Sequence, residues 1–239
     1  MVFEKLENRL IIEGEITALM PLHVGSGRPE VRIGEVISVV RNSEGTPYIP
    51  GSSLKGKIRT EVEKIEKKLG KFVCDPPETK EMCGSKTNDE TKLCVVCQVF
   101  GTAGNKLSRA SKVKFRDALA VGSPGKETRI GIALDRETGS VHEQALYKME
   151  AIPAGTKFKF EIVGENLSDD ELKLLWEGME SVQDAGLGGS STRGLGKVKI
   201  EILKVRERSA EFYKGQKDRE GIFEGETLGD WKKRKGCDL

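Results

Sequence analysis

Alternating apolar and polar residues predict the strands of this chain. Leu10, Ile12, Ile16 and Ala18 fall on one face of the segment 8–19, as in a half-buried strand. Further extended segments are predicted over 31–41, 110–118, 157–163 and 197–205. In the last two of these, the inward side chains are expected to be Phe158, Phe160, Ile162, Val198, Ile200 and Ile202.

The segment 48–70 turns from a loop into a helix. Pro50 and Gly51 mark the turn, and Ser52 or Ser53 can cap the first free backbone amides. Behind them an apolar face recurs at helical spacing, made of Leu54, Ile58, Val62, Ile65 and Leu69.

A second helix is predicted after residue 167. Ser168 and Glu171 have the spacing of a capping box. The core face of this helix is expected to consist of Leu172, Leu175, Trp176, Met179 and Val182. Apart from long intervening segments, the order is then strand, helix, strand, strand, helix, strand. This order predicts an α+β fold, a ferredoxin-like (RRM-like) antiparallel sheet with both helices on one face.

Two long segments interrupt this order and are expected to be insertions on one scaffold. Residues 71–105 are irregular and hold four cysteines. Residues 120–150 are polar and glycine-bearing, and the turn signal at 135–139 predicts a long, protruding hairpin. We therefore expect a single domain over 1–205, followed by a mixed-charge C-terminal arm or partly disordered tail over 206–239.

Charge and composition narrow the class of partner. The chain of 239 residues has a net charge of +2, with 33% charged and 5% aromatic residues. A polyanion must therefore be bound by a local basic patch, and a platform of many stacked rings is not expected. We find no signal peptide and no stretch near the ~20 apolar residues that a membrane span needs. A cytoplasmic protein without a membrane partner is expected.

Cysteines in a cytoplasmic chain indicate metal binding or free thiols before disulfides. Cys94 and Cys97 form a CxxC pair, and Cys74 and Cys83 lie a short loop upstream. Four thiolates in a loop with little apolar content fit a tetrahedral structural zinc site, where the metal supplies folding energy. The alternative is redox-active or merely buried cysteines, although no thioredoxin-like βαβ unit is predicted around the pair. Cys237, near the C-terminal end, is expected to take no part.

The start of the first helix carries basic side chains where the helix dipole disfavours them. Lys55 and Lys57 lie in the first turn and Arg59 follows, near the exposed amides of Ser52 and Ser53. An anion, such as a row of phosphates, would satisfy both the amides and the cations. The alternative is a solvated basic face on an ordinary amphipathic helix.

The glycine-rich loop over 186–196 offers a second anion site. Its glycines, Gly189 among them, allow close approach of another backbone, and Ser190 and Arg193 could contact phosphate. The alternative is a flexible connection, for which the loop is long. His23, where the first strand runs into a glycine turn, is either a phosphate contact or a satisfied structural histidine.

Together these stretches resemble the RAMP superfamily of CRISPR-associated proteins. The nearest resemblance is to the Csm-type repeated backbone subunit of type III (Csm/Cmr) effector complexes, and it covers about residues 8–205. The matching stretches are LHVGSG at 22–27, PYIPGSSLKGKIR at 47–59, CQVFG at 97–101, LDRETG at 134–139, IPAGTKFKFEI at 152–162 and GLGGSSTRGLGKVKI at 186–200. The second and last stretches form a pair that is much more specific than either alone.

The resemblance implies a hand-like protein with a ferredoxin-like palm. Copies of such a subunit stack along a guide RNA (crRNA), pair it with target RNA, and assemble with other CRISPR effector subunits. The residues that would hold the guide backbone are His23, Ser53, Lys55, Arg59 and Arg193. The hairpin over about 120–150 would be a thumb that wedges into the guide–target duplex, and zinc-binding insertions occur in some Csm-like members. The plain structural alternative, a zinc-containing domain with no RNA role, does not account for the paired motifs.

Active members of this family cut target RNA with an aspartate in a context like IGAIDSPV. The matching segment here is 33–40, where the aspartate position falls on Ile37, or on Val36 with a shifted gap. Glu35 is the only acid nearby, and its side chain starts roughly 7 Å away along an extended strand. We therefore expect a subunit without its own nuclease centre. Two alternatives stay open: a Mg²⁺-dependent target-RNA endoribonuclease that uses Glu35, and a guide-processing endoribonuclease that uses His23.

Overall fold

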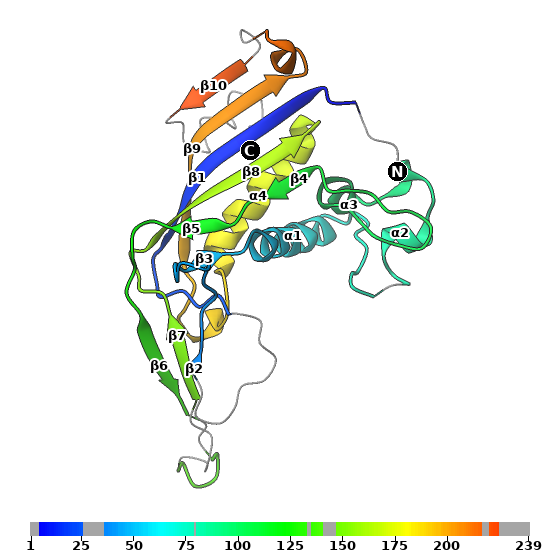
Figure 1. The fold of residues 1–239 in the computed structure, drawn as a ribbon. Helices are drawn as coiled ribbons and strands as arrows, with labels where there is room; N and C mark the ends of the chain where they lie inside the picture. The colour runs from blue at the N-terminus through cyan, green and yellow to red at the C-terminus, as the bar shows by residue number, and fades with distance from the viewer. Residues whose placement is uncertain are drawn as a thin grey trace.

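A computed structural model describes residues 5–25, 36–78, 80–132, 135–140, 147–216 and 220–224. It is a mixed α+β structure with one large antiparallel sheet, two long helices packed on it, a small second sheet, and a cysteine-bearing module beside the first long helix (Figure 1). No helix in these ranges is long and apolar enough to cross a membrane.

The large sheet has seven strands, and each paired neighbour is antiparallel. Its strand order is β10-β9-β1-β8-β5-β3, with β4 also paired to β8. The strands are β1 (Asn8–Ala18), β3 (Tyr48–Ile49), β4 (Val113–Phe115), β5 (Ala118–Ala120), β8 (Lys157–Glu165), β9 (Val198–Ser209) and β10 (Glu220–Glu224). The predicted inward residues of β8, namely Phe158, Phe160 and Ile162, are all buried, which confirms its expected alternation.

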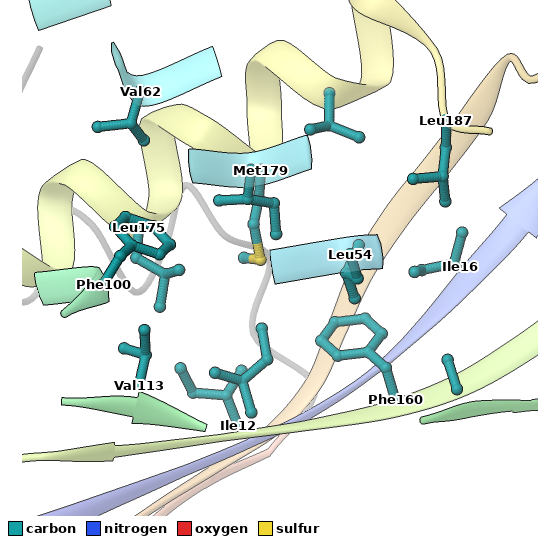
Figure 2. Close-up of a cluster of buried hydrophobic side chains, with 14 of the residues drawn as sticks. Ile12, Ile16, Leu54, Val62, Phe100, Val113, Phe160, Leu175, Met179 and Leu187 are labelled. Carbon is teal, nitrogen blue, oxygen red and sulfur yellow. The ribbon is translucent and has the colours of Figure 1, made fainter. Parts of the chain in front are cut away.

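Two long helices, α1 (Gly51–Lys68) and α4 (Asp169–Ala185), cover the same face of this sheet (Figure 2). Ile12, Val113 and Phe160 project from the strands toward Leu54 of α1 and Met179 of α4. The predicted core face of α4 is confirmed, since Leu172, Leu175, Trp176, Met179 and Val182 are all buried. The capping box of Ser168 and Glu171 is also formed as expected.

Helix α1 differs from its predicted pattern at both ends. Pro50 is the N-cap residue and has no side-chain oxygen to cap with, so the expected cap by Ser52 or Ser53 is wrong. The first amide, at Gly51, donates instead to Asp117 Oδ1 (2.8 Å). At the other end Leu69 is 64% exposed, because the last turn extends past the core.

A small sheet carries the hairpin expected within 120–150. Strands β6 (Glu127–Gly131) and β7 (Tyr147–Ala151) pair antiparallel, and β2 (Val36–Ile37) joins β7 in parallel. The predicted turn forms where Asp135 Oδ1 accepts from the amides of Glu137 and Thr138. Of the extended segment predicted over 31–41, only residues 36–41 are described, so Glu35 lies outside the described residues.

The expected boundary at residue 205 falls inside a strand. β9 continues to Ser209, a 3₁₀ turn η3 (Phe212–Lys214) follows, and β10 pairs back onto β9. The Arg208 Nε–Glu220 Oε1 ion pair (2.6 Å) and the Arg208 guanidinium stacked 4.5 Å from the Phe212 ring hold this extension. The described part of the predicted tail therefore widens the large sheet. Cys237 lies outside the described residues.

The caps of the two long helices make a matched stability test. Ser168→Ala should lower the free energy of unfolding by roughly 1 kcal/mol, because the amide of Glu171 loses its acceptor. Ser52→Ala is the control and should change this free energy by less than about 0.5 kcal/mol, since Ser52 is exposed and is not the N-cap residue of its helix. Urea unfolding followed by circular dichroism measures both, and equal losses would contradict the assignment of the caps.

Candidate nucleic-acid interface and metal centre

Four buried cysteines converge in the module beside α1. The sulfurs of Cys74, Cys83, Cys94 and Cys97 all lie within 4.8 Å of one another. Cys83 begins the short helix α2 (Cys83–Lys86), and Cys94 is the N-cap of α3 (Val95–Phe100), which contains Cys97. A tetrahedral metal with sulfur ligands at ~2.3 Å needs sulfurs roughly 3.8 Å apart. The arrangement therefore fits one metal ion, as the spacing predicted.

Burial and mutual hydrogen bonds shift the pKa values of these thiols in opposite directions. Burial raises the pKa of Cys83 to about 11. Hydrogen bonds from Cys74 and Cys97 lower the pKa of Cys94, and the same network raises the pKa of Cys97. The group thus supports one negative sulfur with its neighbours as donors, while four buried thiolates would need a cation. The Cys74–Cys97 sulfur distance of 3.3 Å is that of free thiols and not of a disulfide.

Two glycines let the backbone of the module pack on itself. A Cβ at Gly84 would lie 2.2 Å from the carbonyl oxygen of Leu107, and one at Gly104 would lie 2.1 Å from the carbonyl carbon of Gly84. One antiparallel bridge closes the loop, since the amides of Thr102 and Arg109 each donate to the other's carbonyl. The close packing at these glycines was not predicted from the sequence, because the contacting carbonyls come from other segments of the module.

A groove of about 340 Å³ joins the two predicted anion-binding stretches. One wall is the first two turns of α1, and the other is formed by the loop after β1 and the glycine-rich loop. Its lining residues are Val24, Gly25, Ile49, Ser53, Gly56, Lys57, Thr60, Leu187 and Gly188. Two segments more than a hundred residues apart in the sequence thus line one groove.

The basic residues of α1 divide between two faces of the helix. Lys57 lines the groove and pairs with the buried carboxylate of Glu61 (2.9 Å). Lys55 and Arg59 are not among the described residues that line it. Lys55 is half-buried, and burial together with the nearby charge of Arg59 lowers its pKa. Ser52 is exposed at the helix start, next to Ser53 in the groove wall.

Arg59 is directed toward the cysteine module. Its Nε donates to Glu63 Oε1 (2.8 Å), and its two terminal nitrogens donate to the carbonyl of Gly101 (3.2 Å) and to Cys97 Sγ (3.6 Å). Burial opposes its charge, but the Glu63 hydrogen bond and the attraction of Cys97 and Cys74 outweigh it and raise its pKa. Arg59, which the sequence analysis expected to hold the guide backbone, therefore contacts the cysteine module and is not among the described residues that line the groove.

His23 is a buried junction between the glycine-rich loop and the small sheet. Its Nδ1 lies 2.6 Å from the carbonyl oxygen of Glu150, which can only accept, so Nδ1 carries the proton. Its own carbonyl accepts from the amide of Gly189 (2.8 Å), and a Cβ at Gly188 would meet that same oxygen at 2.4 Å. With 6% exposure, His23 has the geometry of the structural alternative, and Gly189 is a backbone partner of this histidine.

The tip of the glycine-rich loop contacts strand β7 of the hairpin. Ser190 adopts a left-handed conformation (φ 59°) and its hydroxyl donates to Met149 Sδ (3.8 Å). The exposed Arg193 donates to the hydroxyl of Tyr147 (2.7 Å). Tyr147 was missed from the sequence, although an aromatic residue in a polar hairpin is a detectable signal.

The position expected for a catalytic aspartate is apolar in this chain. Ile37 in β2 pairs with Met149 in β7. The next residue, Glu150, is buried, and its carboxylate accepts from the amide of Val39 (3.0 Å) and from Arg41 (2.7 Å). Burial raises the pKa of Glu150, but these hydrogen bonds outweigh that effect and lower the pKa overall. The carboxylate of Glu150 is therefore occupied by structural hydrogen bonds.

Comparison with known proteins places the chain in a family. The model of the RAMP superfamily matches residues 15–199. The "CRISPR system Cms endoribonuclease Csm3" of Methanocaldococcus jannaschii is 34% identical over 89% of this chain and 87% of its own length. The protein of the same description from Methanothermobacter thermautotrophicus is 29% identical over 95% and 97%. A chain in the crystal structure of a Csm3–Csm4 subcomplex of the type III-A CRISPR-Cas interference complex matches 99% of both chains, with a TM-score of 0.63 and 26% identity. The chain with this groove and cysteine centre belongs to the RAMP superfamily.

Proposed function

We propose that this chain is a guide-RNA-binding backbone subunit of a type III CRISPR interference complex. It holds crRNA and shapes the guide–target duplex in antiviral defence in the cytoplasm. The observation that carries the proposal is the groove, because it unites the start of α1 and the glycine-rich loop, which lie far apart in the sequence. The Csm3 relatives and the Csm3–Csm4 subcomplex support the assignment to a type III complex.

In this proposal the large sheet with α1 and α4 is the ferredoxin-like palm. The strand order β9-β1-β8-β5 supports this, since it places the first strand between the last and the third of the scaffold. The cysteine module and the β6–β7 hairpin are insertions on this palm, and the hairpin is the thumb. The hydrogen bond from Arg193 to Tyr147 links strand β7 of the thumb to the glycine-rich loop, which keeps the two RNA-facing parts close together.

The groove binds the guide through its phosphates. Lys57 supplies charge from one wall, and the free amides at Ser52 and Ser53 supply donors at the positive end of the α1 dipole. The glycine-rich loop supplies backbone donors and Arg193 from the other side. Contacts of this kind ignore base identity, which suits a subunit that must accept any guide. Its partners are crRNA, target RNA, copies of itself and other effector subunits.

We further propose that the four cysteines hold a structural zinc ion. A buried all-sulfur set within 4.8 Å supports zinc over harder cations, which prefer oxygen ligands. Bound zinc would fix the ends of α2 and α3 and thereby the module. No step of RNA binding passes through the metal itself.

A second candidate is a metal-dependent target-RNA endoribonuclease, and the description of the Csm3 relatives as endoribonucleases favours it. Two observations oppose it: Ile37 is apolar, and the carboxylate of Glu150 is already hydrogen-bonded to Val39 and Arg41. Such an enzyme would use Mg²⁺ and a carboxylate, for which Glu35 is the remaining candidate. A guide-processing activity through His23 is less well supported, because that ring is buried against Gly25 and Gly189.

The RNA-binding prediction concerns Lys57 and Arg193. Lys57→Ala and Arg193→Ala should each weaken binding of single-stranded RNA and reduce the slope of log affinity against log salt by about 0.7, one phosphate contact each. The loss should be equal for unrelated guide sequences. Lys64→Ala is the matched control, because Lys64 shares the Glu61 carboxylate with Lys57 but is absent from the described groove wall. Unchanged slopes in both variants would contradict the groove assignment.

The metal prediction concerns stoichiometry. Purified protein should contain close to one equivalent of zinc by elemental analysis. Cys94→Ser combined with Cys97→Ser should remove it, while Cys237→Ser should retain it. Full zinc content in the double variant would refute the site.

The cleavage prediction concerns complexes in which this chain is the only backbone subunit. They should bind complementary RNA without cutting it at regular intervals, because isoleucine can neither bind metal nor move a proton. Glu35→Ala should change nothing, whereas Ile37→Asp should introduce some cutting. Regular target cleavage by the natural protein that disappears in Glu35→Ala would establish the endoribonuclease instead.

A further inference from the structure

Arg59 lies where the cysteine module meets helix α1. Each of its three guanidinium nitrogens has a partner, and Nη2 donates to the sulfur of Cys97 (3.6 Å). Its second partner, the carbonyl of Gly101, is at the C-terminal end of α3. α1 and α3 also lie side by side in Figure 1. We infer that Arg59 is a positioning and charge-compensating residue of the metal centre and not an RNA contact; this rests on the zinc site proposed above.

The charge of the centre gives Arg59 a role. Zinc with four thiolates carries two net negative charges, and the cysteine residues that hold them are at most 5% exposed. A buried negative charge needs a nearby cation or donors, because solvent screens it poorly. Arg59 supplies a permanent positive charge and an N–H to sulfur at once, and its planar group can serve Cys97 and Gly101 together. Donors to metal ligands of this kind commonly tune metal affinity 10–100-fold.

The face of α1 separates Arg59 from the RNA groove. Ser53, Gly56, Lys57 and Thr60 line the groove and recur at helical spacing. Arg59 and its ion-pair partner Glu63 lie four residues apart on another ridge, and neither is among the described lining residues. One helix thus presents RNA-facing cations on one side and a metal-facing cation on another.

This separation predicts opposite effects for two neighbouring cations. Arg59→Gln, which keeps helix propensity but removes the charge and the long guanidinium reach, should weaken zinc binding about tenfold or more. With zinc saturating, its salt dependence of RNA binding should match that of the natural protein. Lys57→Ala should show the reverse: unchanged zinc affinity and a smaller salt slope. Zinc affinity is measured by competition with a chromophoric chelator.

Two further variants separate charge from helix stability. Arg59→Lys keeps the charge and should recover part of the zinc affinity lost in Arg59→Gln. Glu63→Gln removes the i,i+4 partner but leaves the guanidinium, and should stay close to the natural zinc affinity. Should Arg59→Gln fail to fold, Arg59→Lys set against Glu63→Gln decides: a weaker site only in Arg59→Lys supports the inference, and equal affinities overturn it.

These measurements distinguish failure of the Arg59 inference from failure of the proposed zinc site or of the RNA groove. A natural protein that binds zinc tightly, with Arg59→Gln within twofold of it, overturns the role of Arg59 alone. A natural protein that binds no zinc overturns the metal site and this inference, and leaves the RNA groove standing. If zinc-saturated Arg59→Gln has a reduced slope of log RNA affinity against log salt, Arg59 is an RNA contact and the inference is wrong.

Discussion

The close contact of α1 with α4 and with the edge of the large sheet is the constraint on which the other features depend. A Cβ at Gly178 of α4 would lie 2.6 Å from Val62 and 2.8 Å from Ile58, so α4 can approach α1 only with glycine at this position. A Cβ at Gly51 would lie 2.3 Å from the carbonyl oxygen of Phe115, so the first residue of α1 is pressed against the sheet edge. These two contacts fix the direction of α1 and the place where it begins.

Both candidate sites then take their positions from α1. The groove uses the side of the helix that carries Ser53 and Lys57, and the cysteine module docks through Arg59 on another side. The fold does not need a large net charge to bind a polyanion, since +2 overall is compatible with a few cations placed along one wall. The start of α1 adds backbone N–H donors, which do not contribute to the net charge.

Periodic and short-range features could be predicted from the sequence. The alternation in β8, the apolar face of α4, its capping box and the cysteine cluster each depend on neighbouring residues, and the structure has them as expected. The two anion-binding stretches were also recognised, but their meeting across one groove is a property of the folded chain.

The features that were missed depend on contacts between distant segments. Glu61 is buried in α1 because Lys57, Lys64 and the hydroxyl of Ser181 on α4 satisfy it, which helical periodicity alone cannot show. The extension of β9 past residue 205 follows a bulge opposite Glu13 and Gly14, where the pattern of inward residues changes phase. Strand β2, which pairs with β7, has only two residues, so the sequence shows no periodic pattern there.

Hydrogen exchange of the zinc-loaded protein, with and without single-stranded RNA of guide length, tests the central claim most directly. The amides of Ser52 and Ser53 are not bonded within their helix, and those at the tip of the glycine-rich loop are exposed, so their exchange reports directly on a bound phosphate chain. The account predicts that RNA slows exchange at 52–56 and 186–196. It would be contradicted by unchanged exchange there, with protection instead on the open sheet face around Leu119, Val121 and Leu203, which are 46–50% exposed.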